Sequence, residues 1–205
     1  LTRRGIPSEK VRVVPTPLSD SGYTPGDSNM GRQLAGADRF VLYVGRLHRE
    51  KGVAHLLDAF VRLPANAHLV FAGPDGGMLA DLRQRTEALH LSERVRFLGP
   101  VAEDEKRALL AASACLALPS FHEAQGLTIL EAWAQSRPVI ATRVGALAEL
   151  VVDGKNGLLV PYGDVRGLAK ALVRLWNNED AGQRMGRQGR LAAEGYRLDR
   201  LAPEL

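Results

Sequence analysis

The sequence contains no long apolar run. Nowhere among its 205 residues do eighteen or more apolar residues follow one another, so no membrane-spanning helix is expected. Residues 1–10 have neither the apolar core nor the cleavage site of a secretory signal. These absences predict a cytoplasmic protein. The first residue is Leu rather than Met, which is consistent with a piece of a longer polypeptide, and peripheral contact of that polypeptide with a membrane stays open.

Cysteine is nearly absent. The single Cys115 lies in the apolar run C-L-A-L-P, where a lone thiol is expected to be a small buried hydrophobe rather than a nucleophile. This use of cysteine also fits the cytoplasm.

Aromatic residues and phosphate-binding signatures are scarce as well. Aromatics make up 5% of the chain, and the arginines are dispersed among Glu and Asp rather than interleaved with aromatics. The net charge of +4 therefore favours small anionic ligands over nucleic acid as partners. The sequence has no G-x-x-x-x-G-K-[ST] loop and no G-x-G-x-x-G after a strand. A P-loop enzyme and an ordinary dehydrogenase are therefore disfavoured.

The chain does contain a regular alternation of short apolar runs and helical patterns. Six runs of four or five residues, without polar alternation, are expected to be strands: 40–44, 68–72, 95–98, 115–118, 139–142 and 157–160. A helical pattern follows each run: 53–61, a stretch ending near 89, 103–112, a stretch from about 126, 145–150 and 164–176. Such strands form a parallel sheet covered on both faces, and right-handed crossovers make it a Rossmann-like, doubly wound α/β fold. We assign this domain to 39–205, and a linker strand (Val11-Arg-Val-Val14) and hinge region to 1–38.

Ligands of such a sheet bind outside the carboxyl ends of its strands. The loop from Gly45 to Gly52 brings Arg46, Arg49 and Lys51 to that edge, where a helix N-terminus offers unpaired N–H groups. This arrangement predicts an anion site. The alternative is that the three cations are solvated loop charges, and the loop alone does not separate the two.

Two carboxylates flank the helix that follows the fourth strand. Glu123 lies in the preceding loop, the helix is expected to begin near Gly126, and Glu131 lies about 7 Å along its axis. An elongated ligand would fit there, with hydroxyls at both ends and phosphates at the N–H groups of Gly126 and Leu127. A nucleoside diphosphate sugar has that shape.

The same two carboxylates would repel a diphosphate unless cations lie beside them. Arg46 and Lys51 can supply those cations from the same edge. The alternative is that Glu131 pairs with a core Arg and that Glu123 is a loop charge. A glycosidase pair is disfavoured, because the two carboxyl groups are expected to lie farther apart than the about 5 to 9.5 Å that such a pair needs.

Several stretches together resemble the C-terminal, donor-binding domain of the retaining glycosyltransferases of GT-B fold in glycosyltransferase family 4. They are Gly45-Arg-Leu-x-x-x-Lys51-Gly52, the spacing Glu123-x7-Glu131 with Gly126 between, Pro138-Val-Ile-Ala-Thr142, the stretch from Val144 to Val151 (V-G-A-L-A-E-L-V) and the stretch from Asp153 to Asp164 (D-G-K-N-G-L-L-V-P-Y-G-D). The likeness runs from about Gly5 to the C-terminus. Two local departures are Pro15-Thr-Pro-Leu-Ser19, where P-N-G-V-D is frequent, and Glu123-Ala-Gln-Gly126, where E-G-F-G is common.

The resemblance implies roles for the candidate residues. The implied donor contacts are Arg46 and Lys51 at the diphosphate, Glu123 at the sugar hydroxyls, Glu131 at the ribose, and main-chain groups around Arg96 and Phe97 near the base. Gly45, Gly126 and Leu127 complete the predicted donor-binding residues. Arg46 and Lys51 would stabilise the leaving diphosphate, and Glu123 would orient the sugar, a nucleophile being its less favoured role. With no D-x-D sequence present, neither a metal ion nor a cofactor is expected.

The activity implied is transfer of a sugar, with retention, from a UDP-, GDP- or ADP-sugar to an acceptor hydroxyl. The acceptor would bind an N-terminal domain that this sequence lacks. We therefore expect the chain alone to bind the nucleotide part weakly and to transfer no sugar. We also expect the stretch through Asp38 to be mobile and the region 196–202 to be loosely held.

Two other functions stay open. A nucleotide-sugar epimerase of the same architecture would use the donor without an acceptor. A regulatory module that binds a nucleotide without catalysis is a different class, disfavoured because Arg46, Lys51, Glu123 and Glu131 are all present.

Overall fold

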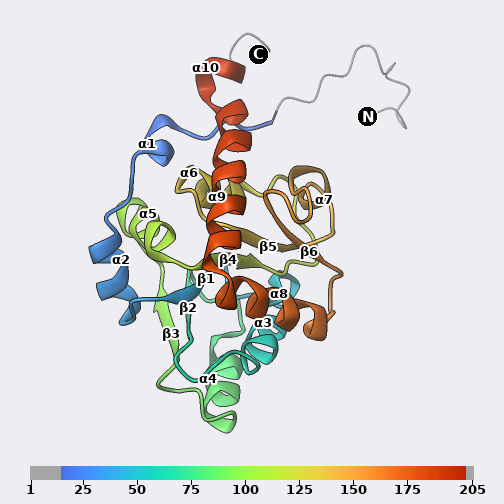
Figure 1. Ribbon diagram of the computed structural model, residues 1–205. Coiled ribbons are helices and arrows are strands. Elements are labelled where there is room, and N and C mark those ends of the chain that lie inside the picture. Colours follow the sequence, from blue (N-terminus) through green and yellow to red (C-terminus); the bar gives the residue numbers. More distant parts are fainter. Residues whose placement is uncertain (1–14, 202–205) are drawn as a thin grey trace.

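The structure, a computed structural model, describes residues 15–201 (Figure 1). The expected strand Val11-Arg-Val-Val14 lies outside the described residues, so its prediction stays open. Within residues 15–201, no helix combines the length and the apolar character that crossing a membrane requires.

A six-stranded parallel sheet forms the centre of the molecule. Its strand order is β3-β2-β1-β4-β5-β6, and every residue of β1, β4, β5 and β6 is buried. Continuous burial explains why these strands are unbroken apolar runs. The doubly wound α/β fold is thus confirmed. The strands are β1 (Phe40–Val44), β2 (His68–Ala72), β3 (Val95–Gly99), β4 (Cys115–Leu118), β5 (Val139–Thr142) and β6 (Gly157–Val160).

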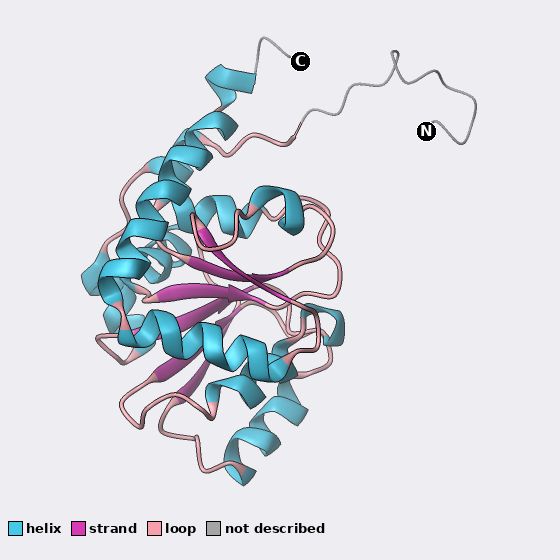
Figure 2. Cartoon of the chain, turned by 45° about the vertical axis from the view of Figure 1, so that its right-hand side comes forward, coloured by secondary structure: helices cyan, strands magenta, loops and turns pink. Residues whose placement is uncertain are grey.

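Helices cover both faces of the sheet (Figures 1 and 2). The helices of one face are α3 (Val53–Phe60), α4 (Leu79–Ala88) and α8 (Val165–Asn177). The main helices of the other face are α2 (Ser28–Ala35), α5 (Glu103–Ala112), α6 (Leu127–Ala134) and α9 (Glu179–Ala193). Short helices complete the chain: α1 (Asp20–Tyr23), η3 (Arg49–Lys51), α7 (Leu147–Leu150), η4 (Glu194–Tyr196) and α10 (Leu198–Leu201).

Residues 15–38 contain two helices that the sequence pattern did not predict. Asp27 is the N-cap of α2, and its carboxylate accepts hydrogen bonds from the N–H groups of Asn29 and Met30. It packs against α5, and a Cβ on Gly31 would strike the main chain of Ala108 in that helix. The described part of the expected linker is therefore packed onto the domain, and its hinge function stays a prediction.

Helix α9 was also missed by the sequence reading. Its buried face contains three glycines, Gly182, Gly186 and Gly189, beside Ala181, Met185 and Ala193, and glycine lowers helix propensity by about 1 kcal/mol per residue. The glycines therefore weaken the helix propensity of this stretch in the sequence. A Cβ on Gly189 would strike the ring of Trp133, which is fully buried in α6. Gly189 therefore lets α9 pack directly against the Trp133 ring of α6.

Cys115 is buried in β4, as the sequence predicted. Burial raises the pKa of its thiol to about 12, with only a small opposing effect from Arg39. The thiol is therefore protonated at neutral pH and is a packing group rather than a nucleophile.

The contact between Gly189 and Trp133 predicts that two Gly→Ala substitutions in α9 will affect stability differently. Gly189→Ala should lower the free energy of unfolding by about 1 to 3 kcal/mol, because the new methyl group overpacks against Trp133. Gly182→Ala is the matched control, since its Cβ would meet Pro138 at an ordinary 3.5 Å, and it should be neutral or stabilise by up to about 1 kcal/mol. Urea unfolding measures both. Equal stabilisation by the two variants would contradict the close α6–α9 contact.

Candidate functional site

The candidate site lies at the carboxyl edge of the sheet, between β1 and β4. These two strands are adjacent in the sheet, and the helices that follow them, α3 and α6, cover opposite faces (Figure 1). Because the loops after β1 and β4 lead to opposite faces, they leave a crevice between them, at the switch point of the doubly wound sheet. Loop 45–52 follows β1 and loop 119–126 follows β4.

Tyr43 fixes the start of the first loop. Its buried hydroxyl donates a hydrogen bond of 2.8 Å to the main-chain oxygen of Arg46. A Cβ on Gly45 would approach this hydroxyl at 2.9 Å, so glycine leaves room for the bond. Burial, assisted by the charge of Glu123, raises the pKa of Tyr43 far above its usual value, which keeps the phenol a donor. The Arg46 side chain is exposed beside Gly76, at the edge where it was predicted.

Gly52 lets the two loops approach each other. It ends η3 and begins α3 with a φ of 66°, a conformation that favours glycine. A Cβ at this position would strike the main-chain oxygen of Pro119. The N–H of Phe121 then donates to the main-chain oxygen of Glu50 over 2.7 Å. The first turn of α3 and the loop after β4 are thereby held together.

Lys51 and Glu123 form an ion pair across these loops. Lys51 Nζ lies 2.8 Å from Glu123 Oε2, and the two side chains are 27% and 19% exposed. The sequence placed both residues at this edge, but it did not predict that they contact each other. Because both side chains are partly buried, water and salt weaken their attraction less than they would on the open surface. The ion pair therefore holds the ammonium and the carboxylate in defined positions.

Helix α6 begins where the sequence predicted. Gly126 is its N-cap with a φ of 76°, and Leu127 is its first residue. A Cβ on Gly126 would meet the Leu147 side chain at 2.8 Å, so a larger residue would be both strained and crowded. The side chain of Leu127 is 40% exposed, and its contribution to a site would come from its backbone N–H. The first N–H groups of α6 have no acceptor within the helix.

Glu131 lies further along α6 and faces α5. Its Oε1 is 2.8 Å from Lys106 Nζ, which also lies 2.9 Å from the exposed carboxylate of Glu103. Burial raises the pKa of Glu131, and the hydrogen bond and charge of Lys106 only partly oppose that shift. The partner of Glu131 is therefore a lysine of α5, not the core Arg that the alternative named.

Arg96 and Phe97 lie on β3, one of the two edge strands of the sheet. The guanidinium of Arg96 reaches the position where a Cβ of Gly36 would be, at the end of α2. Phe97 stacks on Phe71 with ring centroids 5.2 Å apart. Their side chains are thus used in packing, and the predicted role for this strand rests on its main chain.

An aromatic cavity beside the Lys51–Glu123 pair was not found from the sequence. Its volume is about 380 Å³, and its walls include the rings of His55, Phe121 and Tyr162. The Tyr162 ring lies 5.2 Å from His55 and 5.0 Å from Phe121, both edge to face. Phe121 is 56% exposed. An aromatic two positions before Glu123 was the available signal, but helix α3 and two separate loops had to be brought together to reveal the cavity.

Residues 30–192 match the family described as glycosyl transferases group 1. Among curated proteins, the chain is 34% identical to the D-inositol 3-phosphate glycosyltransferase of Corynebacterium urealyticum, over 98% of this chain and 51% of that protein. The chain spans about half the length of the curated relatives it matches.

Solved structures agree with this match. HepE from Anabaena in complex with UDP superposes with a TM-score of 0.89 at 25% identity, over 99% of this chain and 58% of that one. The same protein in complex with UDP-glucose gives 0.87 at 26% identity, over the same shares. The C-terminal domain of the group 1 protein LpcC from Francisella tularensis matches over 88% of this chain and 99% of that domain, with a TM-score of 0.79; at 22% identity it supports the fold alone. The chain therefore belongs to the glycosyl transferases group 1 family and has the α/β fold of GT-B glycosyltransferases.

Proposed function

We propose that the chain is the donor-binding half of a retaining glycosyltransferase of family 4. The observation that carries this proposal is the Lys51–Glu123 ion pair at the switch point, between the N-termini of α3 and α6. A cation beside free helix N–H groups suits a diphosphate. A carboxylate next to it suits the hydroxyls of the attached sugar.

The spacing of the other candidates supports an elongated donor. From β4, where α6 begins, to the outer strand β3 there are three strand intervals, or about 14 Å. A nucleoside diphosphate can cover that span. We assign the phosphates to Arg46, Lys51 and the start of α6, and the base to the main chain around Arg96 and Phe97. Glu131 would exchange Lys106 for the ribose hydroxyls.

We propose a UDP-sugar as the donor. HepE, which is 25–26% identical over nearly the whole chain, is described in complex with UDP and with UDP-glucose. GDP and ADP sugars are the alternatives. Thermal shift of the chain with UDP, GDP and ADP should rank the bases directly, because ligand that binds only the folded state raises its melting temperature.

In the proposed reaction, the bond between the anomeric carbon and the diphosphate oxygen breaks, and its electron pair stays on that oxygen. The acceptor oxygen bonds to the same face of the sugar, and its proton passes to the departing diphosphate. The products are the glycosylated acceptor and UDP. Arg46 and Lys51 would bind the leaving group more tightly as its charge grows, which lowers the barrier.

Lys51 would change partners during this cycle. In the structure, Lys51 Nζ lies 2.8 Å from Glu123 Oε2. When a diphosphate arrives, the ammonium can turn toward it, and Glu123 becomes free to accept hydrogen bonds from the sugar. The acceptor would bind a further domain, and closure between the two halves would exclude water.

Removal of either cation should weaken UDP binding. Arg46→Ala and Lys51→Ala should each cost about 1.5 to 3 kcal/mol, the scale of a charge-assisted hydrogen bond. Isothermal titration calorimetry of the chain with UDP measures the loss. Lys155→Ala is the control: Lys155 is exposed just before β6, at the opposite edge of the sheet, and its loss removes the same charge. Unchanged affinity in both site variants would refute the diphosphate assignment.

Removal of the carboxylate at position 123 should have the reverse effect on UDP. Glu123→Gln frees Lys51 and removes a negative charge beside the phosphates, so affinity for UDP should rise about three- to tenfold. Affinity for UDP-glucose should rise less or fall, because the sugar loses its acceptor. Calorimetry with both ligands gives the ratio. A drop in UDP affinity would show that Glu123 does not compete for Lys51.

The ribose assignment predicts a ligand-dependent effect of Glu131→Gln. Affinity for UDP should fall, whereas a 2′,3′-dideoxy analogue should be nearly insensitive to the substitution. Loss of stability should stay below the about 3 to 5 kcal/mol of a broken buried pair, since Lys106 keeps Glu103 as a partner at 2.9 Å.

Glu103→Gln is the control for this experiment. It removes the other partner of Lys106 and should leave UDP affinity unchanged. If Glu131→Gln lowers the melting temperature steeply and leaves the affinity for UDP intact, Glu131 is a core partner of Lys106 and not a ligand of ribose.

A further inference from the structure

A second cavity in the described part of the chain lies outside the candidate site. Its volume is about 740 Å³, and it runs between α3 and α8 on the outer side of their layer. Its lining comes only from these two helices and the residues next to them, and none of its residues belongs to the loops at 45–52 or 119–126.

The floor of this α3–α8 groove is apolar and periodic. Val165, Ala169 and Val173 line it at intervals of four residues along α8. At about 1.5 Å per residue they span about 12 Å, or two helical turns. Ala169 is 6% exposed and the two valines are half-buried. The floor is thus a shallow row of methyl groups that a second apolar row can cover.

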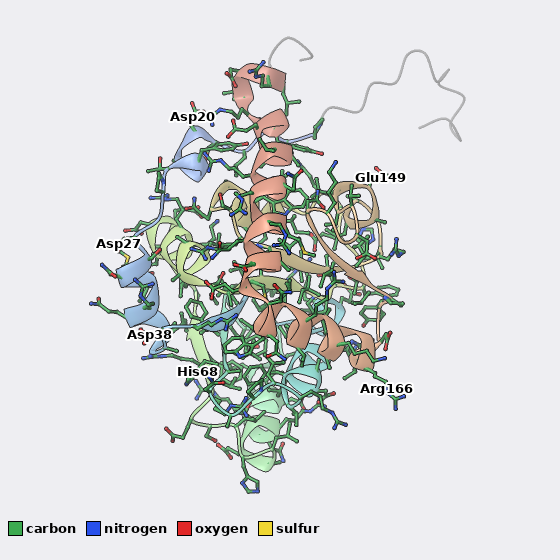
Figure 3. The ribbon with its side chains drawn as sticks, viewed as in Figure 1. Asp20, Asp27, Asp38, His68, Glu149 and Arg166 are labelled. Atoms are coloured by element: carbon green, nitrogen blue, oxygen red, sulfur yellow. The ribbon has the colours of Figure 1, made fainter. Side chains whose placement is uncertain are left out.

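The rim of the groove is strongly cationic. Arg166, Lys170 and Arg174 follow the floor with the same four-residue repeat, and Arg62, just beyond α3, lines the groove as well. All four are exposed. Figure 3 shows Arg166 on the outer side of α8, directed away from the sheet.

The acidic residue in the lining does not offset these cations. Asp58 lies 2.6 Å from Arg85 of α4, so its charge is already paired. The groove therefore combines an apolar floor with an excess of positive charge, and its occupant must carry an apolar row flanked by negative charge.

We propose that the α3–α8 groove docks an acidic amphipathic helix of a partner protein. A helix satisfies its own backbone hydrogen bonds, whereas an extended peptide needs an open sheet edge or an aromatic-lined groove. This groove lies between two helices, and its lining contains no aromatic residue. Apolar residues of the partner at i, i+4 and i+8 match the floor, and carboxylates beside them match the cations. Docking on this outer face would leave the loops of the candidate site uncovered.

Two other occupants fit less well. A flat bilayer would meet the exposed cations but would not reach the floor between the helices. A second copy of this chain carries the same cations and a net charge of +4, so the two copies would repel each other.

The test uses a designed probe peptide and the chain itself. The peptide has about sixteen residues, with Leu at i, i+4 and i+8, Glu on both flanks and a fluorescent label. Two matched peptides replace either the Leu residues or the Glu residues by Gln. Fluorescence anisotropy should detect saturable binding of the first peptide only. Amide chemical shifts of Val165, Ala169 and Val173 should change on titration.

Variants of the chain then locate the site. Lys170→Glu with Arg174→Glu should weaken binding of the acidic peptide about tenfold. Arg184→Glu with Arg187→Glu is the matched control, because both residues are exposed on α9 and the change in net charge is the same. The control should change the affinity less than about twofold, and urea unfolding checks that both variants fold.

Three results would overturn the proposal. Equal binding of the peptide without Leu would show that charge alone drives binding and that the apolar floor does not contribute. Equal weakening by the α9 control would show that the groove is not the site. Binding to vesicles of phosphatidylglycerol and phosphatidylcholine that depends on Lys170 and Arg174, with no binding of the peptide, would assign the surface to a membrane.

Discussion

The parallel direction of all six strands is the constraint on which the molecule depends. Each strand must return to the same starting edge before the next can begin, so every connection crosses a face of the sheet as helix or loop. The carboxyl ends then gather at one edge. Residues as distant in sequence as Tyr43, Lys51 and Glu123 meet there because of this constraint. The geometry of the candidate site is a consequence of the fold, not of any one loop.

The strands and the start of α6 could be predicted because their causes are local. A strand buried on both faces must be a continuous apolar run, and β4, β5 and β6 begin and end at the predicted residues. The helix start at Gly126 was recognisable because a glycine after a polar loop tolerates a positive φ. Fold class and the position of the candidate edge both follow from such features.

The features that were missed depend on what lies across the fold. Helix α9 has glycine where a helix is usually apolar, and this makes sense only once Trp133 is known to lie against it. The pairing of Lys51 with Glu123 joins residues 72 positions apart, and that of Glu131 with Lys106 joins two helices. A single sequence gives the types of these residues but not which of them meet.

The position of Trp133 makes it an intrinsic fluorescence probe of helix α6. The chain has two tryptophans. The indole of Trp133 is fully buried and donates a hydrogen bond to the main-chain oxygen of Asn156 over 2.9 Å, whereas Trp176 lies under the guanidinium of Arg39, 4.4 Å from its ring centroid. Because α6 carries both Trp133 and the proposed phosphate contacts at its start, a shift of this helix would change the surroundings of one indole and leave the other as an internal reference. Intrinsic emission can therefore follow events at the carboxyl edge without any added label.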